Sequence, residues 1–289
     1  MRNRRHVMIG DIHGELDGLH EILKQAGLID RTDAWIGGEA ILVQTGDVID
    51  RGPDSMGCVA LLRDLQRQAP AAGGRVVRLL GNHELMVLQD EAWQMDYSDP
   101  WKLARSFRRE IVRGDLCAAF SDGNRLITHA GLDPRLQIEL EREMGFDGEC
   151  GTADRLAEIL NTILIRAAKA DDFGGHGIFD IGQDRGGWAE VGGVFWNDFS
   201  SFARSATSRD LPQIFGHSTT GWPGVATAGT GRLIDIDAGL YEGFGGYRLY
   251  LDIDELGSIE EVALRYGTWE RTNIAKGADD CHSLTCAGE

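Results

Sequence analysis

The stretch Leu42-Val43-Gln44-Thr45-Gly46-Asp47-Val48-Ile49-Asp50-Arg51-Gly52 predicts an apolar strand that runs into a loop bounded by glycines. The loop carries two acids, Asp47 and Asp50, and one base, Arg51. All three lie just past the carboxyl end of the strand, where open α/β sheets bind their ligands. We therefore take this loop as the candidate site around which the rest of the chain is organised.

The same arrangement occurs in two other places. An apolar run over residues 7–9 leads into Gly10-Asp11-Ile12-His13-Gly14, and a run over 76–80 leads into Gly81-Asn82-His83-Glu84. Apolar residues at helical spacing follow over 16–26 and 56–65. Strand, polar loop and helix in that order predict βαβ units and a mainly parallel sheet with one functional edge.

Four further segments have strand patterns. Residues 125–128 end in His129, and residues 213–216 end in His217. Alternation over 232–237 and 247–252 predicts two more strands, which we expect to pair with each other and with 262–266.

We expect one domain over residues 1–275, with helical insertions at about 85–120 and 135–193. Glycine and aspartate are frequent in 171–193, so this part is the expected mobile or cap segment. Small and polar residues dominate 276–289, which predicts a disordered tail.

The composition limits the classes of partner. The chain has 289 residues, 42% of them hydrophobic and 26% charged, which is ordinary for a globular protein. The formal net charge of −17 argues against nucleic acid and anionic membrane as partners, because both require Lys and Arg to neutralise phosphate. A substrate carrying phosphate would need strong positive charge within the site itself, which metal ions supply.

The five cysteines have no regular spacing, so a disulfide framework is not expected. This favours a reducing compartment, and we expect the protein to be cytoplasmic. No stretch is long and apolar enough to span a membrane.

The polar residues at the strand ends form a set typical of metal ligands. Carboxylate, imidazole and amide donors without a thiolate suit Mn²⁺, Fe or Zn²⁺ better than Ca²⁺ or Cu(I). Six candidates besides His83 are too many for one ion and suit two ions about 4 Å apart, which hold an in-line displacement at phosphorus. The candidate ligands are Asp11, His13, Asp47, Asn82, His129 and His217.

Each candidate alone has an ordinary interpretation. A Gly-Asp pair after a strand is usually a turn, Asn82 could begin a helix, and a lone arginine such as Arg51 is most often a surface charge. The coincidence of five such motifs in the same structural context makes the ordinary interpretation of all of them improbable.

These motifs, in this order, resemble the signature of the calcineurin-like metallophosphoesterases. The second motif, ending in Asp50-Arg51-Gly52, is similar to that of the phosphoprotein phosphatases. Trp35-Ile36-Gly37-Gly38 before Leu42-Val43-Gln44 resembles the Shewanella-like branch. The resemblance implies an α/β fold in which two mixed sheets form a sandwich flanked by helices, with helical insertions.

The resemblance also implies roles. Asp11, His13 and Asp47 would hold one metal ion, and Asp47 would bridge to a second ion. Both ions are expected to be Mn²⁺, with Fe or Zn²⁺ as alternatives. The second ion would be held by Asp47, Asn82, His129 and His217. A metal-bound hydroxide would attack phosphorus directly, and His83, oriented by Asp50, would protonate the leaving oxygen.

Arg51 would clamp phosphate oxygens, and Asn82 would also contact substrate. The family usually has a second phosphate-binding arginine, often just after a tryptophan, but here Trp196 is followed by Asn197-Asp198. Arg185 is our candidate for that role, ahead of Arg204.

The expected function is hydrolysis of phosphomonoesters, with phosphorylated Ser/Thr or Tyr side chains of proteins as substrates. One alternative is a dinucleoside tetraphosphatase or nucleotide phosphatase, which shares the motifs. A more remote one is an inactive phosphate-binding scaffold. The cysteines lack a Cys-x5-Arg arrangement, which disfavours a cysteine-based tyrosine phosphatase.

Overall fold

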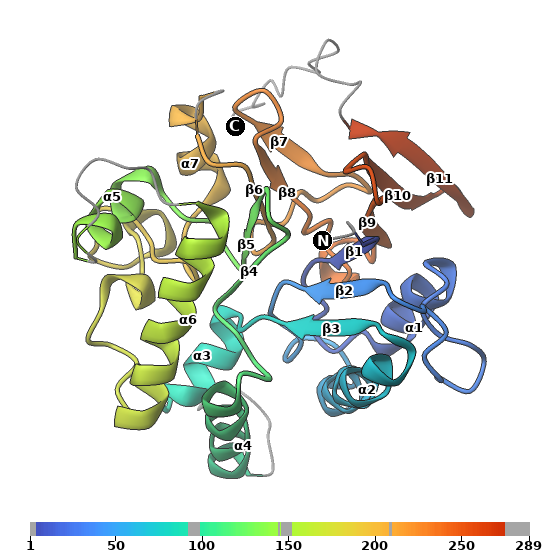
Figure 1. The fold of residues 1–289 in the computed structure, drawn as a ribbon, viewed down its shortest axis with the longest axis horizontal. Helices are drawn as coiled ribbons and strands as arrows, with labels where there is room; N and C mark the ends of the chain where they lie inside the picture. The colour runs from blue at the N-terminus through green and yellow to red at the C-terminus, as the bar shows by residue number, and fades with distance from the viewer. Residues whose placement is uncertain (1–3, 92–98, 144, 146–151, 208–209, 275–289) are drawn as a thin grey trace.

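The computed structural model describes residues 4–91, 99–143, 145, 152–207 and 210–274, which form two mixed β-sheets flanked by helices (Figure 1). This confirms the fold class predicted for the chain. The predicted tail, 276–289, lies outside the described residues, and the domain boundaries stay a prediction.

The first sheet has six strands and combines both pairing directions. β1 and β3 both pair with β2 in parallel, whereas β9 joins β1 in the antiparallel direction and is followed by β10 and β11. In spatial order the strands are β11 (Thr268–Asn273), β10 (Ile259–Arg265), β9 (Leu249–Ile253), β1 (His6–Ile9), β2 (Ile41–Gln44) and β3 (Arg75–Arg78).

The second sheet has five strands, of which β5, β6 and β8 are parallel and the two edge strands are antiparallel. In spatial order they are β4 (Ala119–Ser121), β5 (Leu126–Thr128), β6 (Gln213–Phe215), β8 (Leu233–Asp235) and β7 (Ala226–Ala228). The βαβ pattern predicted one mainly parallel sheet. The structure instead has two mixed sheets, with parallel pairing among β1, β2 and β3 in the first and among β5, β6 and β8 in the second.

One strand prediction was wrong. The segments 232–237 and 247–252 do not pair with each other, because β8 lies in the second sheet and β9 in the first. The connection between them, which includes the short 3-10 helix η5 (Glu242–Phe244), crosses from one sheet to the other. The predicted pairing of 247–252 with 262–266 is confirmed in part: β9 pairs with β10, and within 262–266 this pairing includes Val262 and Ala263.

Strand alternation explains the sandwich, because successive side chains point to opposite faces. In β1, Met8 packs in a cluster formed between the two sheets, together with Ile127 of β5 and Ile214 of β6. Its neighbours Val7 and Ile9 belong to the other cluster, which includes the helices. Both faces of β1 are therefore buried, which accounts for its continuous apolar run.

The helices cover the outer faces of the sheets (Figure 1). α1 (Leu16–Gln25) and α2 (Ser55–Gln68) lie by β1, β2 and β3, and the described parts of the predicted insertions contain α3 (Asn82–Leu88), α4 (Pro100–Arg113), α5 (Pro134–Glu143) and α6 (Ala153–Ala170). The segment 171–193 holds η3 (Gly177–Phe179) and η4 (Gln183–Arg185), and α7 (Phe199–Ser205) follows. Nowhere in the described ranges does a helix combine the length and apolarity needed to cross a bilayer.

Candidate functional site

The carboxyl ends of the parallel strands of both sheets bring the predicted site residues together. The loops after β1, β2 and β3 come from the first sheet, and those after β5, β6 and β8 come from the second. Backbone hydrogen bonds join the loops to one another. For example, Ile12 N and His13 N both donate to Asp47 O over 2.9 Å. The site is therefore assembled from segments that are far apart in the chain.

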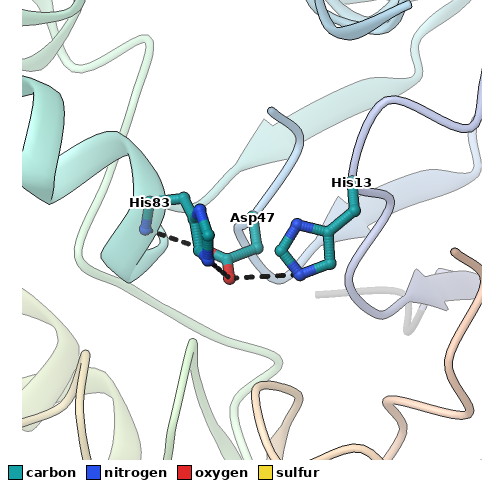
Figure 2. Close-up of side chains that lie close together, drawn as sticks. All are labelled: His13, Asp47 and His83. Atoms are coloured by element: carbon teal, nitrogen blue, oxygen red, sulfur yellow. Dashed lines mark hydrogen bonds and ion pairs between the residues drawn. The ribbon is translucent and has the colours of Figure 1, made fainter. Parts of the chain in front are cut away.

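Asp47 lies at the centre of this assembly and adopts a left-handed backbone with φ of 54°. Its Oδ2 lies 3.5 Å from His13 Nε2, while its Oδ1 lies 3.6 Å from His129 Nε2. Figure 2 shows His13 and His83 on either side of the Asp47 carboxylate. The two carboxylate oxygens therefore face two different groups of predicted ligands.

The first group contains Asp11, His13 and Asp47. His13 Nε2 lies 3.9 Å from Asp11 Oδ2, in addition to its contact with Asp47. The other ring nitrogen, Nδ1, lies 3.0 Å from the carbonyl oxygen of Ile49. A carbonyl only accepts, so Nδ1 carries the proton and Nε2 presents a lone pair to the carboxylates.

The second group is centred on His129. Its Nε2 lies 2.9 Å from Asn82 Oδ1 and 3.2 Å from His217 Nδ1, besides the 3.6 Å to Asp47 Oδ1. Its Nδ1 donates to the carbonyl oxygen of Thr45 over 3.0 Å, which leaves Nε2 unprotonated. Nε2 therefore turns a lone pair toward two side-chain oxygens, and a cation between these atoms would remove the repulsion.

Burial and charge favour the protonation states that metal binding requires. Burial lowers the pKa of His13 to about 4 and also lowers the pKa values of His129 and His217. Burial by itself would raise the pKa of Asp47, but the surrounding histidines, His83 foremost, hold it below its usual range. Neutral imidazoles around an ionised carboxylate are the forms in which these groups bind a metal.

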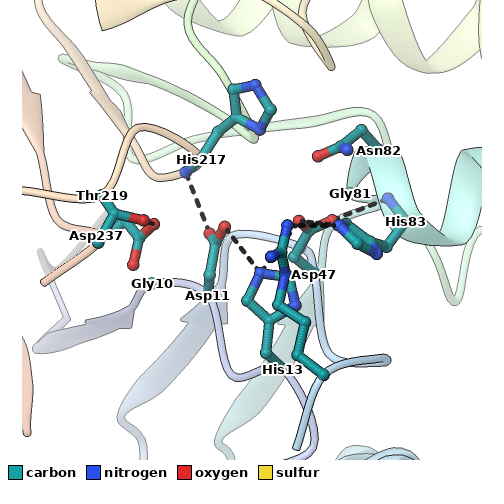
Figure 3. A network of polar contacts seen from close by, with 12 residues as sticks. Gly10, Asp11, His13, Asp47, Gly81, Asn82, His83, His217, Thr219 and Asp237 are labelled. Atoms are coloured by element: carbon teal, nitrogen blue, oxygen red, sulfur yellow. Dashed lines mark hydrogen bonds and ion pairs between the residues drawn. The ribbon is translucent and has the colours of Figure 1, made fainter. Parts of the chain in front are cut away.

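The pKa of Asp11 is shifted in the opposite direction to that of Asp47. Burial, followed by the nearby charges of Asp237 and Asp47, raises its pKa well above the usual range. Figure 3 shows Asp11 with His13 and Asp47 on one side and Asp237 and Thr219 on the other. The excess of negative charge, together with the converging lone pairs, fits a site built for cations.

His83 lies at the start of α3 and differs from the other histidines. Its Nδ1 is 2.5 Å from Asp50 Oδ2, and its backbone N–H donates to Asp47 Oδ1 over 3.0 Å. Burial lowers the pKa of His83, but the charge of Asp47 and the hydrogen bond that His83 donates to Asp50 more than offset this, so the pKa is raised overall. His83 is thus suited to hold a proton near neutral pH.

Arg51 lies next to His83, with Nη2 3.2 Å from His83 Nε2. Its guanidinium lies over the ring of Phe244, 4.8 Å from the centroid, which favours a defined orientation. The backbones of both Asp50 and Arg51 are left-handed, with φ of 70° and 69°. This strained turn directs both side chains to His83.

Arg185 lies beside the second group of ligands. Its Nη2 donates to Ser218 Oγ over 2.8 Å, one residue from His217, and its Nε lies 2.9 Å from Asp198 Oδ2. Arg204, the other candidate, is exposed and donates to Ser201 Oγ. Of the two, the structure brings only Arg185 into contact with the loop that carries His217.

Sequence reasoning missed three residues near the site: Phe244, Asp235 and Asp237. Burial raises the pKa of Asp235 well above its usual range and that of Asp237 to about 6. The strand-end pattern Ile234-Asp235-Ile236-Asp237 was a usable signal, since it repeats the context of Asp11. Phe244 lies more than 190 residues from Arg51 in the chain, and its loop carried no motif.

Comparisons with known proteins agree with this architecture. The calcineurin-like phosphoesterase family matches residues 5–218. Shewanella-like protein phosphatase 2 of Arabidopsis thaliana is 45% identical over 87 residues, which cover 30% of this chain but only 22% of that protein. An uncharacterized protein of Schizosaccharomyces pombe is 51% identical, with 89% of this chain and 80% of the yeast protein covered.

Among solved structures, a cold-active protein-tyrosine phosphatase of a psychrophilic Shewanella species superimposes with a TM-score of 0.63 at 22% identity. The superposition covers 93% of this chain and 80% of that protein. At this identity the likeness concerns the fold. From the match over residues 5–218, the chain belongs to the calcineurin-like phosphoesterase family, and among curated proteins it is similar to the Shewanella-like protein phosphatases.

Proposed function

We propose that the protein is a phosphoprotein phosphatase that uses two divalent metal ions. Family membership and the protein-phosphatase relatives support a phosphoric monoester hydrolase, and the proposal adds its metals, residues and substrate. The observation that carries the proposal is the division of the Asp47 carboxylate, with Oδ2 toward His13 and Oδ1 toward His129. A carboxylate placed in this way suits a bridge between two ions.

Asp11, His13 and Asp47 would hold one ion, and Asp47 with Asn82, His129 and His217 would hold the other. When bound, the ions would activate a water molecule for attack on phosphorus and offset the charge of the phosphoryl group. The donor set of oxygen and nitrogen atoms favours Mn²⁺, with Fe or Zn²⁺ as alternatives, and the described residues around Asp47 add no thiolate to it.

His83 would act as the general acid. It would pass the proton on Nε2 to the leaving oxygen. Asp50 would accept the hydrogen bond from Nδ1 throughout and would stabilise the imidazolium before the proton is transferred. Nε2 lies 3.8 Å from Asp47 Oδ2 and thus next to the first group of ligands. The donor is therefore fixed in orientation and close to where the substrate would react.

Two arginines would bind the phosphoryl oxygens. Arg51 is held over the ring of Phe244, and Arg185 is held by Asp198 and Ser218. A guanidinium that is held in place loses less conformational entropy when it binds a phosphate. The amide of Asn82 would contribute a further contact to substrate.

The substrate would be a phosphorylated Ser, Thr or Tyr side chain of a protein. Relatives described as protein phosphatases support this class. We further propose that residues 1–275 act as one catalytic domain and, from the irregular cysteines, that the protein acts in the cytoplasm.

The test is hydrolysis by metal-stripped protein after separate addition of Mn²⁺, Zn²⁺, Fe²⁺ and Mg²⁺. We expect p-nitrophenyl phosphate to be cleaved and bis(p-nitrophenyl) phosphate to be spared. Phosphopeptides should then be better substrates than dinucleoside tetraphosphates. Preference for the dinucleotide would favour a nucleotide hydrolase, and metal binding without turnover would favour a binding protein.

A further inference from the structure

Glu84 contacts the backbone of the loops that carry Asp47 and Asn82, and the proposed mechanism does not use it. Its side chain is almost completely buried, with 2% exposed. Its Oε1 accepts hydrogen bonds from Val48 N (2.9 Å) and Ile49 N (3.2 Å). Its Oε2 accepts from Asp47 N (3.0 Å) and Gly81 N (2.9 Å). One carboxylate thus satisfies four backbone donors from two loops.

Three of these donors are successive residues, 47–49. The left-handed backbone of Asp47, after Gly46 with φ of 106°, turns their N–H groups toward one point. Successive N–H groups arranged in this way form a concave nest that attracts an anion such as phosphate. Here the anion in the nest is a side chain of the protein itself. All four partners donate, so they match a carboxylate.

Gly81 allows the two loops to meet. A Cβ atom at this position would overlap Asp47 N and Oδ1 and would lie 2.8 Å from Glu84 Oε2. The residues that directly follow Gly81 are Asn82 and His83. Glu84 therefore ties the loop of Asp47 to the start of α3, which carries a predicted ligand and the predicted acid.

We propose that Glu84 is a positioning residue for the metal centre: its carboxylate fills the nest formed by Asp47, Val48, Ile49 and Gly81, and so sets where the Asp47 carboxylate points. With its N–H directed at Glu84, Asp47 accepts from His83 N at Oδ1 and keeps its two oxygens facing the two ligand groups. This inference rests on the proposed metal site and adds the residue that preorganises it.

The test is the affinity of metal-stripped protein for Mn²⁺ alone, measured by titration calorimetry. In Glu84→Gln the side-chain size is kept, but an amide NH₂ group must face backbone donors. We expect the affinity to fall by roughly tenfold to hundredfold, the usual effect of losing a group that orients metal ligands. Equal affinities of Glu84→Gln and the unsubstituted protein would overturn the inference and leave the proposed function standing.

The matched control is Glu110→Gln. Glu110 is a second buried carboxylate, 4% exposed, and its hydrogen-bond partners Arg63, Arg78 and Ser106 lie outside the ligand loops. This variant should lose thermal stability and keep its Mn²⁺ affinity. A loss of affinity as large as that of Glu84→Gln would mean that general destabilisation is responsible, and the inference would fall. No Mn²⁺ binding by the unsubstituted protein would overturn the proposed function and this inference with it.

A second measurement does not depend on the folding of a variant. Amide hydrogen exchange in the metal-free, unsubstituted protein should be slow at Val48 and Ile49, because Glu84 holds their N–H groups before any metal binds. Exchange as fast as in the exposed turn at Tyr266 and Gly267 would overturn the inference.

Discussion

Asp50 Oδ2 and His83 Nδ1 are 2.5 Å apart, although the two residues come from different loops and are 33 positions apart in the chain. The carboxylate fixes one edge of the imidazole and leaves the other edge, Nε2, beside Asp47 and Arg51. His13 and His129 instead direct Nδ1 to backbone carbonyl oxygens, and this difference is the reason for proposing His83, and not those two histidines, as the proton donor.

Replacing His83 by Ala should keep the metal ions and slow turnover by several hundredfold, within the roughly 10²–10⁴-fold that a general acid contributes. The loss should be larger for phenyl phosphate than for p-nitrophenyl phosphate, since a poor leaving group needs the proton most. Steady-state rates with both esters, together with metal content, check this. Loss of metal would show that His83 is a ligand.

Replacing Asp50 by Asn should lower kcat by about a hundredfold, because the neutral amide no longer stabilises the imidazolium of His83. The Km for p-nitrophenyl phosphate should change little. If Km rises while kcat is unchanged, Asp50 acts in substrate binding and not through His83.

Asp47→Asn should abolish activity and reduce the number of bound ions. The neutral amide removes the charge of the carboxylate that lies 3.5 Å from His13 Nε2 and 3.6 Å from His129 Nε2, nearer to both histidines than Asp11 is. Elemental analysis of dialysed protein gives the metal-to-protein ratio. Full activity and two bound ions in this variant would contradict the bridging role.

Arg185→Ala should lower kcat/Km for phosphopeptides by roughly 10–100-fold, which corresponds to the loss of one or two charge-assisted hydrogen bonds to phosphate. Arg204→Ala is the matched control, because Arg204 is exposed and donates to Ser201. Its kinetics should match those of the unsubstituted protein. Equal losses in the two variants would remove Arg185 from the site.

Glu110 predicts how stability depends on pH away from the site. Burial raises its pKa, but Arg78 and Arg63 more than offset this, so the folded pKa lies below the usual value. The interaction of ionised Glu110 with Arg78 and Arg63 therefore stabilises the folded protein fully above the unfolded pKa of about 4.3. This contribution is lost as the pH falls through the folded pKa of Glu110.

In metal-free protein, Glu110→Gln should reduce the free energy of unfolding by about 3–5 kcal/mol at neutral pH, since it leaves Arg78 buried without its carboxylate. The difference in free energy of unfolding between this variant and the unsubstituted protein should shrink as the pH is lowered below the unfolded pKa of Glu110. Urea unfolding of both proteins at a series of pH values measures this difference. The exposed pair of Arg155 and Glu158 gives the control, and Glu158→Gln should have little effect at any pH.

The sequence alone predicted the residues of the candidate metal site. Polar side chains after apolar strands, next to glycines, mark the carboxyl ends of strands, and that signal is local in the chain. The loop 45–52 shows this directly: its strand, its glycines and its acids were all visible in the sequence, and the structure brings Asp47 together with His13, His129 and His217. The family resemblance rested on the same local motifs.

Only the tertiary structure decided how these residues are arranged. That the two oxygens of Asp47 face different groups depends on the nest around Glu84 and on strands from both sheets. Arg185 contacts Ser218 across 33 positions, and β9 joins the first sheet although β8 belongs to the second. Contacts of this kind depend on how distant segments pack, and a local pattern of residues carries no information on that packing.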